Sequence, residues 1–262
     1  MSIWITGDIH GNPVGRFSTR RFLQQKDKEL FPEDKSSVII ICGDFGCVWD
    51  FRGENAEEKD KLDWLENKPW TTVFVCGNHE NHKRLAQYPV KEWNGGLVHE
   101  IRPHVLHLMR GEIYTIEEKK FFAFGGASSH DIQDGILDRN NYSSEEEFKH
   151  TYKKWYLRGK MFRVKDVSWW EEELPSESEM KNGKTNLNKH DYKVDYIITH
   201  SPSASTIALL GHGLYEQDIL TMYLEDIKSS TEFKRHYCGH MHIDAYVNEK
   251  DVILYTSMER IN

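Results

Sequence analysis

The stretch "FVCGNHEN" (Phe74–Asn81) joins an apolar run to a row of polar side chains. The run stops at Gly77, and Asn78, His79 and Glu80 follow directly. Alone, this sequence is weak evidence of function, because Gly-Asn makes a good turn and His and Glu are ordinary loop residues. It gains weight because the same construction, an apolar run that ends in polar side chains, recurs along the chain.

Four other apolar runs end in the same way. They are "IWITGDIHG" with Asp8 and His10, "VIIICGDFG" with Asp44, "YIITHSP" with His200, and "RHYCGHMH" with His240 and His242. Carboxylates, imidazoles and amide oxygens are all metal ligands. Five strand ends therefore carry groups that can bind metal ions.

The first three runs indicate strands. They lie at residues 3–7, 38–43 and 72–77, and segments of helical character, "RRFLQQKDKEL" and "AEEKDKLDWLEN", separate them. Apolar strands that alternate with helices are typical of strand–helix–strand units with a parallel sheet. We therefore expect parallel, buried strands in this part of the chain.

The polar strand ends follow a regular spacing. There are 34 residues from His10 to Asp44 and another 34 from Asp44 to Asn78. This is about the length of one strand–helix–strand unit. Because the carboxyl ends of parallel strands meet at one crevice, we expect these side chains to converge with Asp8 and His79.

The later part of the chain continues the core. Candidate strands follow at about residues 105–109, 113–116 and 121–125, and we expect them to form meander pairs packed on the first sheet. After a charged segment the core resumes at "VDYIITH", with helices near residues 203–210 and 215–228. The last predicted strands lie in "RHYCGHMH" and "DVILYTS".

The segment at about residues 130–192 interrupts this core. It is charged, aromatic and largely helical, as in "SSEEEFKHTYKKWYLRGK" and "SWWEEELPSESEMKNGKTN". We interpret it as an insertion that forms a cap or rim beside the site; the alternative is a solvated helical flank. The length of the chain fits one large domain, so we expect a single domain over residues 1–262.

The composition predicts a soluble, globular protein, with 38% hydrophobic and 29% charged residues. No apolar run approaches the roughly 20 residues of a membrane span. Met1 is followed at once by "SIWITGD", which reads as a strand rather than a signal peptide, so we expect a cytoplasmic location. The four cysteines lack CxxC spacing, which favours buried thiols over disulfides or a zinc knuckle.

The formal net charge of −8 argues against non-specific nucleic-acid binding through a basic surface. A phosphorylated substrate is compatible with it, because metal ions can supply positive charge locally. The candidate ligands are two carboxylates, four imidazoles and one amide, which suit Mn²⁺, Fe²⁺ or Zn²⁺. Seven ligands exceed what one ion takes, and Asp44 can bridge two ions roughly 3.5–4 Å apart. With a bridging hydroxide such a site carries about +1 and attracts a phosphate ester.

The order of the motifs resembles that of the calcineurin-like metallophosphoesterase superfamily. The motifs are "GDIHG", "GDFG", "GNHE", a histidine before Ser-Pro, and "GHMH". Together they span most of the chain and are far more specific than any one of them. The resemblance implies an α/β fold, a four-layer αββα sandwich with a largely helical insertion, and a two-metal site between its sheets.

Carried over position by position, the resemblance implies two overlapping sets of ligands to two divalent ions. One ion would bind Asp8, His10, Asp44 and His242, and the other would bind Asp44, Asn78, His200 and His240. His79 is then the catalytic histidine, which either donates a proton to the leaving oxygen or stabilises the phosphoryl group. Glu80 is expected to orient the loop. Mn²⁺ is the favoured ion, with Fe²⁺ and Zn²⁺ as alternatives.

One departure narrows the class of enzyme. Protein Ser/Thr phosphatases of this superfamily carry an arginine in a GDxxxR-like pattern, whereas in "GDFGCVWDFR" Arg52 lies too far along. This difference argues against a phosphoprotein phosphatase. The stretches "GGASSHD" and "SWWEEELPS" instead look like those of small bacterial and phage metallophosphoesterases.

Other polar and aromatic residues are secondary candidates. His130 and Asp131 follow a strand that should end near the site and are candidates for a substrate contact. Arg84 is a candidate for a phosphate contact, with a surface role as the alternative. Trp169 and Trp170 are expected to anchor the cap to the core, and stacking on a nucleobase is the alternative.

The nine histidines outside the motif set are expected to be polar surface or rim residues. The examples are His82, His99, His107 and His212.

These observations predict a metal-dependent hydrolase. The expected reaction is hydrolysis of a phosphomonoester or phosphodiester, on a phosphorylated small molecule or nucleotide, by in-line attack of a metal-bridging hydroxide. The alternative is a non-catalytic, metal-supported interaction scaffold on the same fold. That alternative usually goes with eroded ligand motifs, whereas all seven positions are intact here.

Overall fold

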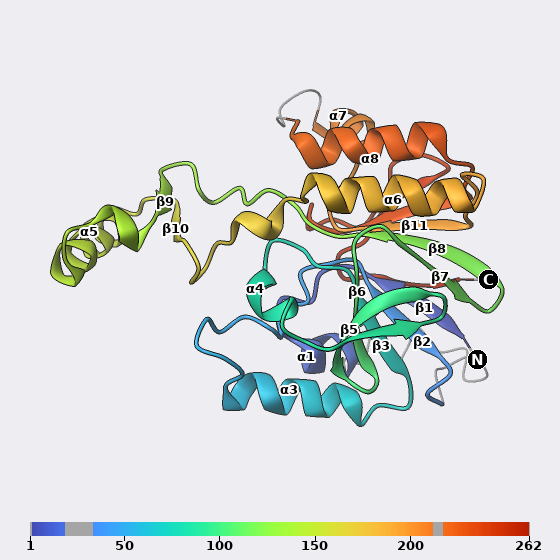
Figure 1. The fold of residues 1–262 in the computed structure, drawn as a ribbon, viewed down its shortest axis with the longest axis horizontal. Coiled ribbons are helices and arrows are strands. Elements are labelled where there is room, and N and C mark those ends of the chain that lie inside the picture. The colour runs from blue at the N-terminus through green and yellow to red at the C-terminus, as the bar shows by residue number, and fades with distance from the viewer. Residues whose placement is uncertain (1, 19–33, 212–216, 262) are drawn as a thin grey trace.

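A computed structural model describes residues 2–18, 34–211 and 217–261 of the chain. The segment "RRFLQQKDKEL" and His212 lie outside these residues. Two β-sheets lie face to face between two layers of helices (Figure 1). The predicted four-layer αββα sandwich is therefore confirmed. A small helical arm extends from the body on the side away from both chain ends (Figure 1).

The first sheet contains the predicted parallel strands. In spatial order its seven described strands are β15 (Met258–Ile261), β1 (Ile3–Thr6), β2 (Val38–Ile41), β3 (Thr71–Phe74), β6 (Val105–Leu108), β5 (Gly96–Arg102) and β4 (Val90–Trp93). Strands β1, β2, β3 and β6 are parallel, whereas β15, β5 and β4 pair antiparallel with their neighbours.

The second sheet contains the C-terminal strands of the chain. In order its six described strands are β13 (Ala245–Tyr246), β14 (Asp251–Ile253), β12 (Arg235–Cys238), β11 (Tyr196–Thr199), β8 (Lys119–Phe124) and β7 (Glu112–Ile116). The predicted meander on the first sheet is wrong in detail. Strand β6 belongs to the first sheet, and the β7–β8 hairpin belongs to the second. Pairing partners far apart in the sequence decide sheet membership, and the local apolar pattern does not reveal them.

Strand β2 shows how the apolar runs build the layers. Val38 and Ile40 pack between the sheets, whereas Ile39 and Ile41 pack toward the helices. Successive side chains of a strand point to opposite faces, so a strand covered on both faces has a continuous apolar sequence. This explains why the sequence "VIII" is fully buried.

Helices cover the outer face of each sheet (Figure 1). Helices α1 (Pro13–Phe17) and α3 (Ala56–Glu66) lie on the first sheet, and the short α4 (His82–Leu85) follows β3. Helices α6 (Glu177–Lys189) and α8 (Ile219–Ser230) pack on the second sheet, with α7 (Ala204–Gly211) beside α8. Helix α3 starts with a capping box in which Asn55 and Glu58 bind each other's backbone N–H.

The segment at residues 130–192 consists of two parts. Strands β9 (Gly135–Leu137) and β10 (Phe162–Val164) pair in parallel and are joined through η1 (Arg139–Asn141) and α5 (Glu145–Leu157). We call this unit, residues 135–164, the arm; Figure 1 shows it projecting from the body. The second part, η2 (Glu171–Glu173) and α6, returns to the sandwich, where α6 packs on the second sheet.

The arm has a small core of its own. Leu137, Phe148 and Val164 are buried together, and Trp155 and Phe162 pack against them. Parallel strands cannot be joined by a tight turn, so α5 is the crossover that this pairing needs.

Two further sequence predictions concern individual residues and segments. The four cysteines are buried free thiols, as expected. Among the helices that the structure describes, none has the length and apolar character needed to cross a bilayer.

Candidate metal centre

The predicted ligands lie where the strands of both sheets end, and their backbone is unusual there. His10, Asp44, His240 and His242 all adopt positive φ angles, between 44° and 67°. Residues with a Cβ rarely occupy this region, and a cluster of such residues is typical of functional sites. The observed strain therefore marks this edge of the sandwich as a candidate site.

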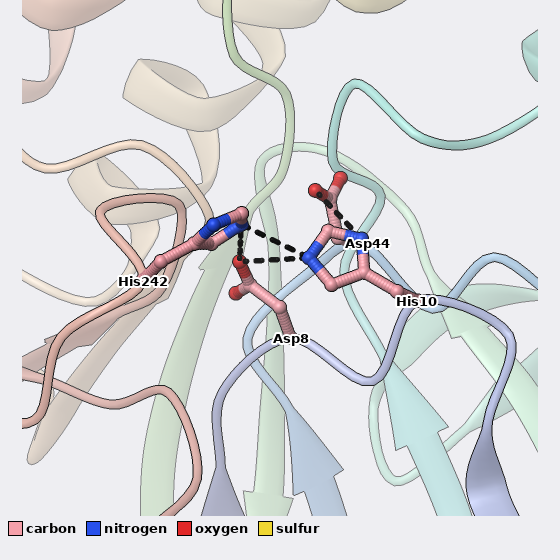
Figure 2. Close-up of side chains that lie close together, drawn as sticks. All are labelled: Asp8, His10, Asp44 and His242. Atoms are coloured by element: carbon pink, nitrogen blue, oxygen red, sulfur yellow. Dashed lines mark hydrogen bonds and ion pairs between the residues drawn. The ribbon is translucent and has the colours of Figure 1, made fainter.

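One group of ligand atoms contains Asp8, His10, Asp44 and His242. One ligand atom from each lies within 4.8 Å of all the others (Figure 2). The His10 and His242 Nε2 atoms are 3.0 Å apart, and His242 Nε2 is 3.4 Å from Asp8 Oδ2. His10 Nδ1 lies 3.7 Å from Asp44 Oδ2. All four side chains point toward one another from loops of both sheets (Figure 2). We call them the first ligand group.

A second group surrounds His200. The His200 Nε2 atom lies 3.2 Å from Asp44 Oδ1, 3.3 Å from Asn78 Oδ1 and 3.2 Å from His240 Nδ1. His200 is fully buried, and its Nδ1 lies 2.8 Å from the carbonyl oxygen of Cys42, which fixes the ring orientation. The two oxygens of Asp44 thus face different groups. We call Asp44, Asn78, His200 and His240 the second ligand group.

Glycines before the ligands make these approaches sterically feasible. A Cβ on Gly77 would lie 2.1 Å from Asp44 Oδ1, and a Cβ on Gly239 would lie 2.1 Å from Asp8 Oδ1. Both distances are far shorter than any tolerated contact, and the obstructing atoms belong to buried carboxylates. The glycine in "GNHE" and that in "GHMH" therefore leave room for a ligand from another loop.

Two buried carboxylates give this edge of the sandwich a negative charge. Asp8 and Asp44 are each only 1% exposed. Burial alone would raise the pKa of Asp44, but attraction to His200 lowers it well below its usual range. Burial would lower the pKa of His200, but the Asp44 and Asp8 carboxylates raise it to about 10. Two buried carboxylates thus draw a positive charge into the site.

The carboxylate of Glu80 connects two of the loops. Its Oε1 accepts from the backbone N–H of Phe45 at 2.5 Å and of Gly46 at 3.2 Å. Its Oε2 accepts from the Gly77 N–H at 2.5 Å. The loops after β2 and β3 are therefore held together by one buried side chain, which agrees with the predicted role of Glu80 in orienting the loop.

His79 lies at the rim of the ligand groups and contacts a residue that sequence reasoning missed. Its Nε2 is 3.9 Å from Asp44 Oδ2 and 3.0 Å from Arg163 Nη2. Arg163 comes from β10 of the arm and is 6% exposed. It also donates to the Asn78 carbonyl oxygen at 3.3 Å and pairs with Asp131 at 2.6 Å. The sequence lacks the arginine of the GDxxxR-like pattern. This absence was the signal that could have prompted a search for an arginine from another part of the chain.

The contact fixes the hydrogen-bonding role of His79. A guanidinium group only donates hydrogen bonds, so His79 Nε2 must accept from Arg163. Burial lowers the pKa of His79 to about 4, and the charge of Arg163 acts in the same direction. His79 is therefore neutral near pH 7, with a lone pair rather than a proton on the nitrogen that faces Asp44.

The prediction that Arg84 is free to contact phosphate or lies on the surface is wrong. Arg84 is 9% exposed and its Nη1 lies 2.8 Å from Glu58 Oε2 and 2.9 Å from the Asp50 carbonyl oxygen. Glu58 is itself part of the cap of α3, so both partners of this pair are committed to the fold. Sequence alone does not show such a pairing across 26 residues.

Trp169 and Trp170, which follow the arm in the sequence, both contact other side chains. Trp170 is 1% exposed and packs edge-to-face on Trp49 at 5.1 Å, and Trp169 Nε1 donates to Glu173 Oε1 at 2.9 Å. The contact of Trp170 with Trp49 agrees with the predicted anchoring, whereas Trp169 contacts a residue of its own segment. His130 is exposed, with its ring centroid 4.3 Å from that of His240, at the rim of the second ligand group.

The predicted surface position is wrong for three histidines. His82, His107 and His236 are only 8%, 5% and 0% exposed. His107 Nδ1 lies 2.9 Å from that of His99, which is half-buried. The His107 ring packs against Phe74 on the helix-covered face of the first sheet and stacks on the His99 ring, so it acts as a small aromatic group.

Comparison with known sequences identifies the family. A sequence model described as calcineurin-like phosphoesterase matches residues 1–244. The chain belongs to the calcineurin-like phosphoesterase family. Membership supports the assignment of the chain as a phosphoester hydrolase that uses divalent metal ions and acts on phosphorylated substrates.

A relative supports the same class. Lariat debranching enzyme A from Xenopus laevis is 24% identical over 157 residues, which cover 55% of this chain and 27% of that protein. The chain therefore matches about a quarter of the length of this relative.

Proposed function

We propose that this chain is a two-metal phosphoesterase. The main observation in favour is that the two ligand groups share Asp44. Its Oδ2 faces the first group, and its Oδ1 faces the second. Under this proposal Asp8, His10, Asp44 and His242 hold one ion, and Asp44, Asn78, His200 and His240 hold the other. The arrangement supports the ligand sets implied by the sequence motifs.

The donor chemistry fits divalent ions of the Mn²⁺, Fe²⁺ and Zn²⁺ type, because it combines carboxylates, imidazoles and an amide oxygen without thiolates. We propose Mn²⁺ as the preferred ion. Buried carboxylates without a cation are costly, so the site is better satisfied with metal than without it. When bound, such ions supply an activated water and positive charge for the phosphoryl oxygens.

Beyond the proposed metal ligands, the protein contributes the hydrogen-bonded pair of His79 and Arg163 at the edge of the site. We propose that the buried Arg163 holds the ring of His79 in place, and that His79, with the positive charge of Arg163 beside it, stabilises the negative charge on the phosphoryl group. The observation in favour is the 3.0 Å contact in which His79 Nε2 accepts from Arg163. This supports the phosphoryl-stabilising role of His79 over proton donation to the leaving oxygen.

Two further assignments are also part of this proposal. We propose that residues 1–262 form one domain in which the arm borders the site, because Arg163 of β10 contacts His79. The buried free thiols favour a reducing compartment such as the cytoplasm.

A substrate screen with Mn²⁺-loaded protein tests the proposed activity. The panel contains aryl phosphomonoesters, aryl phosphodiesters, cyclic nucleotides and dinucleotide polyphosphates, and the metal content of the same sample is measured. We expect turnover of a monoester or a diester that disappears on chelation and returns with Mn²⁺. Absence of turnover on every substrate, with two ions bound per chain, would support the scaffold alternative instead.

A further inference from the structure

A cleft opens beside the two ligand groups. It encloses about 510 Å³ and is bordered by the loop after β2, the first turns of α3 and the loop that carries His10. His10 and His79 lie at the end nearest the ligand groups. Small-molecule sites enclose roughly 300–1,000 Å³. A phosphoryl group held by the ligand groups would thus have this cleft available for the organic part of its substrate.

We propose that the cleft binds the nucleoside of a nucleotide substrate, with its base stacked on Trp49. This inference rests on the proposed phosphoesterase function and adds the class of substrate. It assigns the selectivity of the site to residues that bind no metal.

Besides His79, the cleft lining has two aromatic rings, the exposed Phe51 and the half-buried Trp49, and the base is assigned to Trp49. The ring of Trp49 is nearly parallel to that of His79, with centroids 5.7 Å apart and an angle of 24° between planes. It packs edge-to-face with the buried Trp170, with centroids 5.1 Å apart and an angle of 78° between planes. Trp49 remains half-buried rather than covered. Two neighbours therefore hold the indole in place before a ligand arrives, and a rigid, partly exposed aromatic ring is the group on which nucleobases stack.

Lys61 and Glu57 make the cleft polar as well as aromatic. Lys61 Nζ lies 2.6 Å from Glu57 Oε1, and the Lys61 side chain is 28% exposed. A Cβ on Gly11 would lie 3.8 Å from Lys61 Nζ, so the ammonium group is next to the loop that carries His10.

A nucleotide matches both features of the cleft. Its flat base fits an aromatic ring, its sugar hydroxyls can pair with a carboxylate, and its phosphate can pair with an ammonium group. An alkyl phosphate would leave Trp49 without a ring to stack on, and a purely apolar ligand would bury the Lys61–Glu57 pair without hydrogen-bonding to it. A nucleotide is therefore the class of ligand that uses both Trp49 and the Lys61–Glu57 pair.

Binding measurements test this inference without relying on turnover. The probes are the phosphonate analogues of adenosine 5′-monophosphate and of ribose 5-phosphate, in which a methylene group replaces the ester oxygen. Calorimetry on Mn²⁺-loaded protein gives both dissociation constants. Stacking of one base on an aromatic side chain corresponds to about a ten- to 100-fold gain in affinity, so we expect the adenosine analogue to bind that much more tightly.

Variants assign the gain to individual residues. Trp49→Ala should remove the preference for the adenosine analogue, and Trp49→Phe should retain most of it. Lys61→Met should weaken both analogues by a similar factor, because both carry the phosphonate. Tyr156→Ala, which removes an aromatic ring that is 68% exposed on the arm, should change neither. Trp49→Leu, with metal content checked, keeps apolar bulk at this position if Trp49→Ala fails to fold.

Two outcomes would overturn the inference: equal affinity of the two analogues for the wild type, or an unchanged preference in a folded Trp49→Ala or Trp49→Leu protein. If aryl esters are still hydrolysed in those cases, the nucleoside assignment fails and the phosphoesterase function stands. Failure to bind either analogue or to hydrolyse any ester would instead refute the proposed function. The dissociation constant of a single-stranded tetranucleotide with the same phosphonate end is compared with that of the adenosine analogue. Tighter binding of the tetranucleotide would indicate a nucleic-acid end as the substrate, and tighter binding of the adenosine analogue would indicate a free nucleotide.

Discussion

Asp44 is the side chain on which both ligand groups depend, because each of its oxygens faces one of them. We expect Asp44→Asn to weaken the binding of both ions, by more than the roughly 10–100-fold typical of changing a residue behind a metal ligand. Asp8→Asn should mainly weaken the first ligand group and serves as the matched control. Metal counting by emission spectroscopy on both purified variants measures this. Two ions at full occupancy in Asp44→Asn would contradict the bridging role.

His79 and Arg163 should behave as a unit, because a single hydrogen bond joins their side chains. We expect His79→Asn and Arg163→Ala each to lower kcat/KM by about 100-fold, the size typical of losing a charge-stabilising group. The loss should be similar for a nitrophenyl ester and for an alkyl ester of the same phosphate class.

The comparison of the two esters decides which role His79 has. General acid catalysis matters most when the leaving oxygen is strongly basic, so a proton donor would show a much larger loss on the alkyl ester. That result, with metal content unchanged, would restore the proton-donor role and contradict the assignment to phosphoryl stabilisation. Loss of a metal ion in His79→Asn would make the residue a ligand.

The candidate ligand residues were easier to find in the sequence than the residues that surround them. Asp8, Asp44 and Asn78 were identifiable because an apolar run ends immediately before each of them. Arg163 was not identifiable, because it lies in an insertion and reaches the site only through the pairing of β9 with β10. The pairing of Arg84 with Glu58 is equally remote in sequence.

Among the secondary-structure elements, those with continuous apolar runs were predicted, and of the edge strands only β7 was predicted, whereas β4, β13 and β15 were not. Strands β1, β2, β3 and β11 are almost entirely buried. Strand β4 is mostly exposed and β15 is only partly buried, so neither has a distinctive apolar sequence. An edge strand needs no apolar face of its own, and its partner is decided by tertiary pairing.

A buried ionic network joins elements of the second sheet and should make stability depend on pH. Asp251 of β14 lies 2.7 Å from Lys228 Nζ of α8 and 3.0 Å from His236 Nδ1 of β12. Burial opposes the charged form, but His236 and Lys228 lower the pKa of Asp251 well below its usual range. Because the folded pKa is the lower one, this contribution to stability is complete above about pH 5 and is lost as the pH falls.

Asp251→Asn tests this network. The variant leaves the nearly buried Lys228 without its anionic partner, so we expect the free energy of unfolding at pH 7 to fall by about 3–5 kcal/mol. It should also depend less on pH between about pH 5 and 3 than that of the wild type. Urea unfolding at several pH values measures both effects. Asp226→Asn, an exposed change on the same helix, is the control and should lie within about 0.5 kcal/mol of the wild type. A similar small effect for Asp251→Asn would refute the role of this network.

The arm should be able to open separately from the sandwich, because its small core lies apart from the other clusters. We expect Phe148→Ala, which empties the centre of this core, to cost about 3–5 kcal/mol locally. Hydrogen exchange should then increase in α5, β9 and β10, and activity should fall toward that of Arg163→Ala while metal content is unchanged.

Tyr156→Ala on the same helix removes an exposed ring and is the matched control for the arm. It should change neither exchange nor activity. Full activity in a Phe148→Ala protein whose arm exchanges rapidly would show that Arg163 is not needed at the site.

For the whole molecule, the important feature is that both ligand groups draw on both sheets. Asp8, His10, Asp44 and Asn78 follow strands of the first sheet, and His200, His240 and His242 follow strands of the second. Convergence within the first sheet follows from the rule for parallel strand ends. The second sheet ends at the same edge because of the way the two sheets pack. The sequence pattern does not specify this packing, and only the family resemblance implied it.

The proposed two-metal site predicts that metal ions stabilise the fold as well as the reaction, because each ion would connect the two sheets. A ligand that binds only the folded state adds about 2.7 kcal/mol at a free concentration 100 times its dissociation constant. For a domain of roughly this size each kcal/mol raises Tm by about 2–4 °C. We therefore expect Tm to rise by about 5–10 °C when chelated protein receives excess Mn²⁺, and to keep rising with Mn²⁺ concentration. Calorimetry on wild type and Asp44→Asn measures this, and the variant should show a much smaller rise. A Tm that is independent of Mn²⁺ in a wild-type protein with two bound ions would mean that the ions bind the folded and unfolded chains equally, which would contradict a preformed site shared by both sheets.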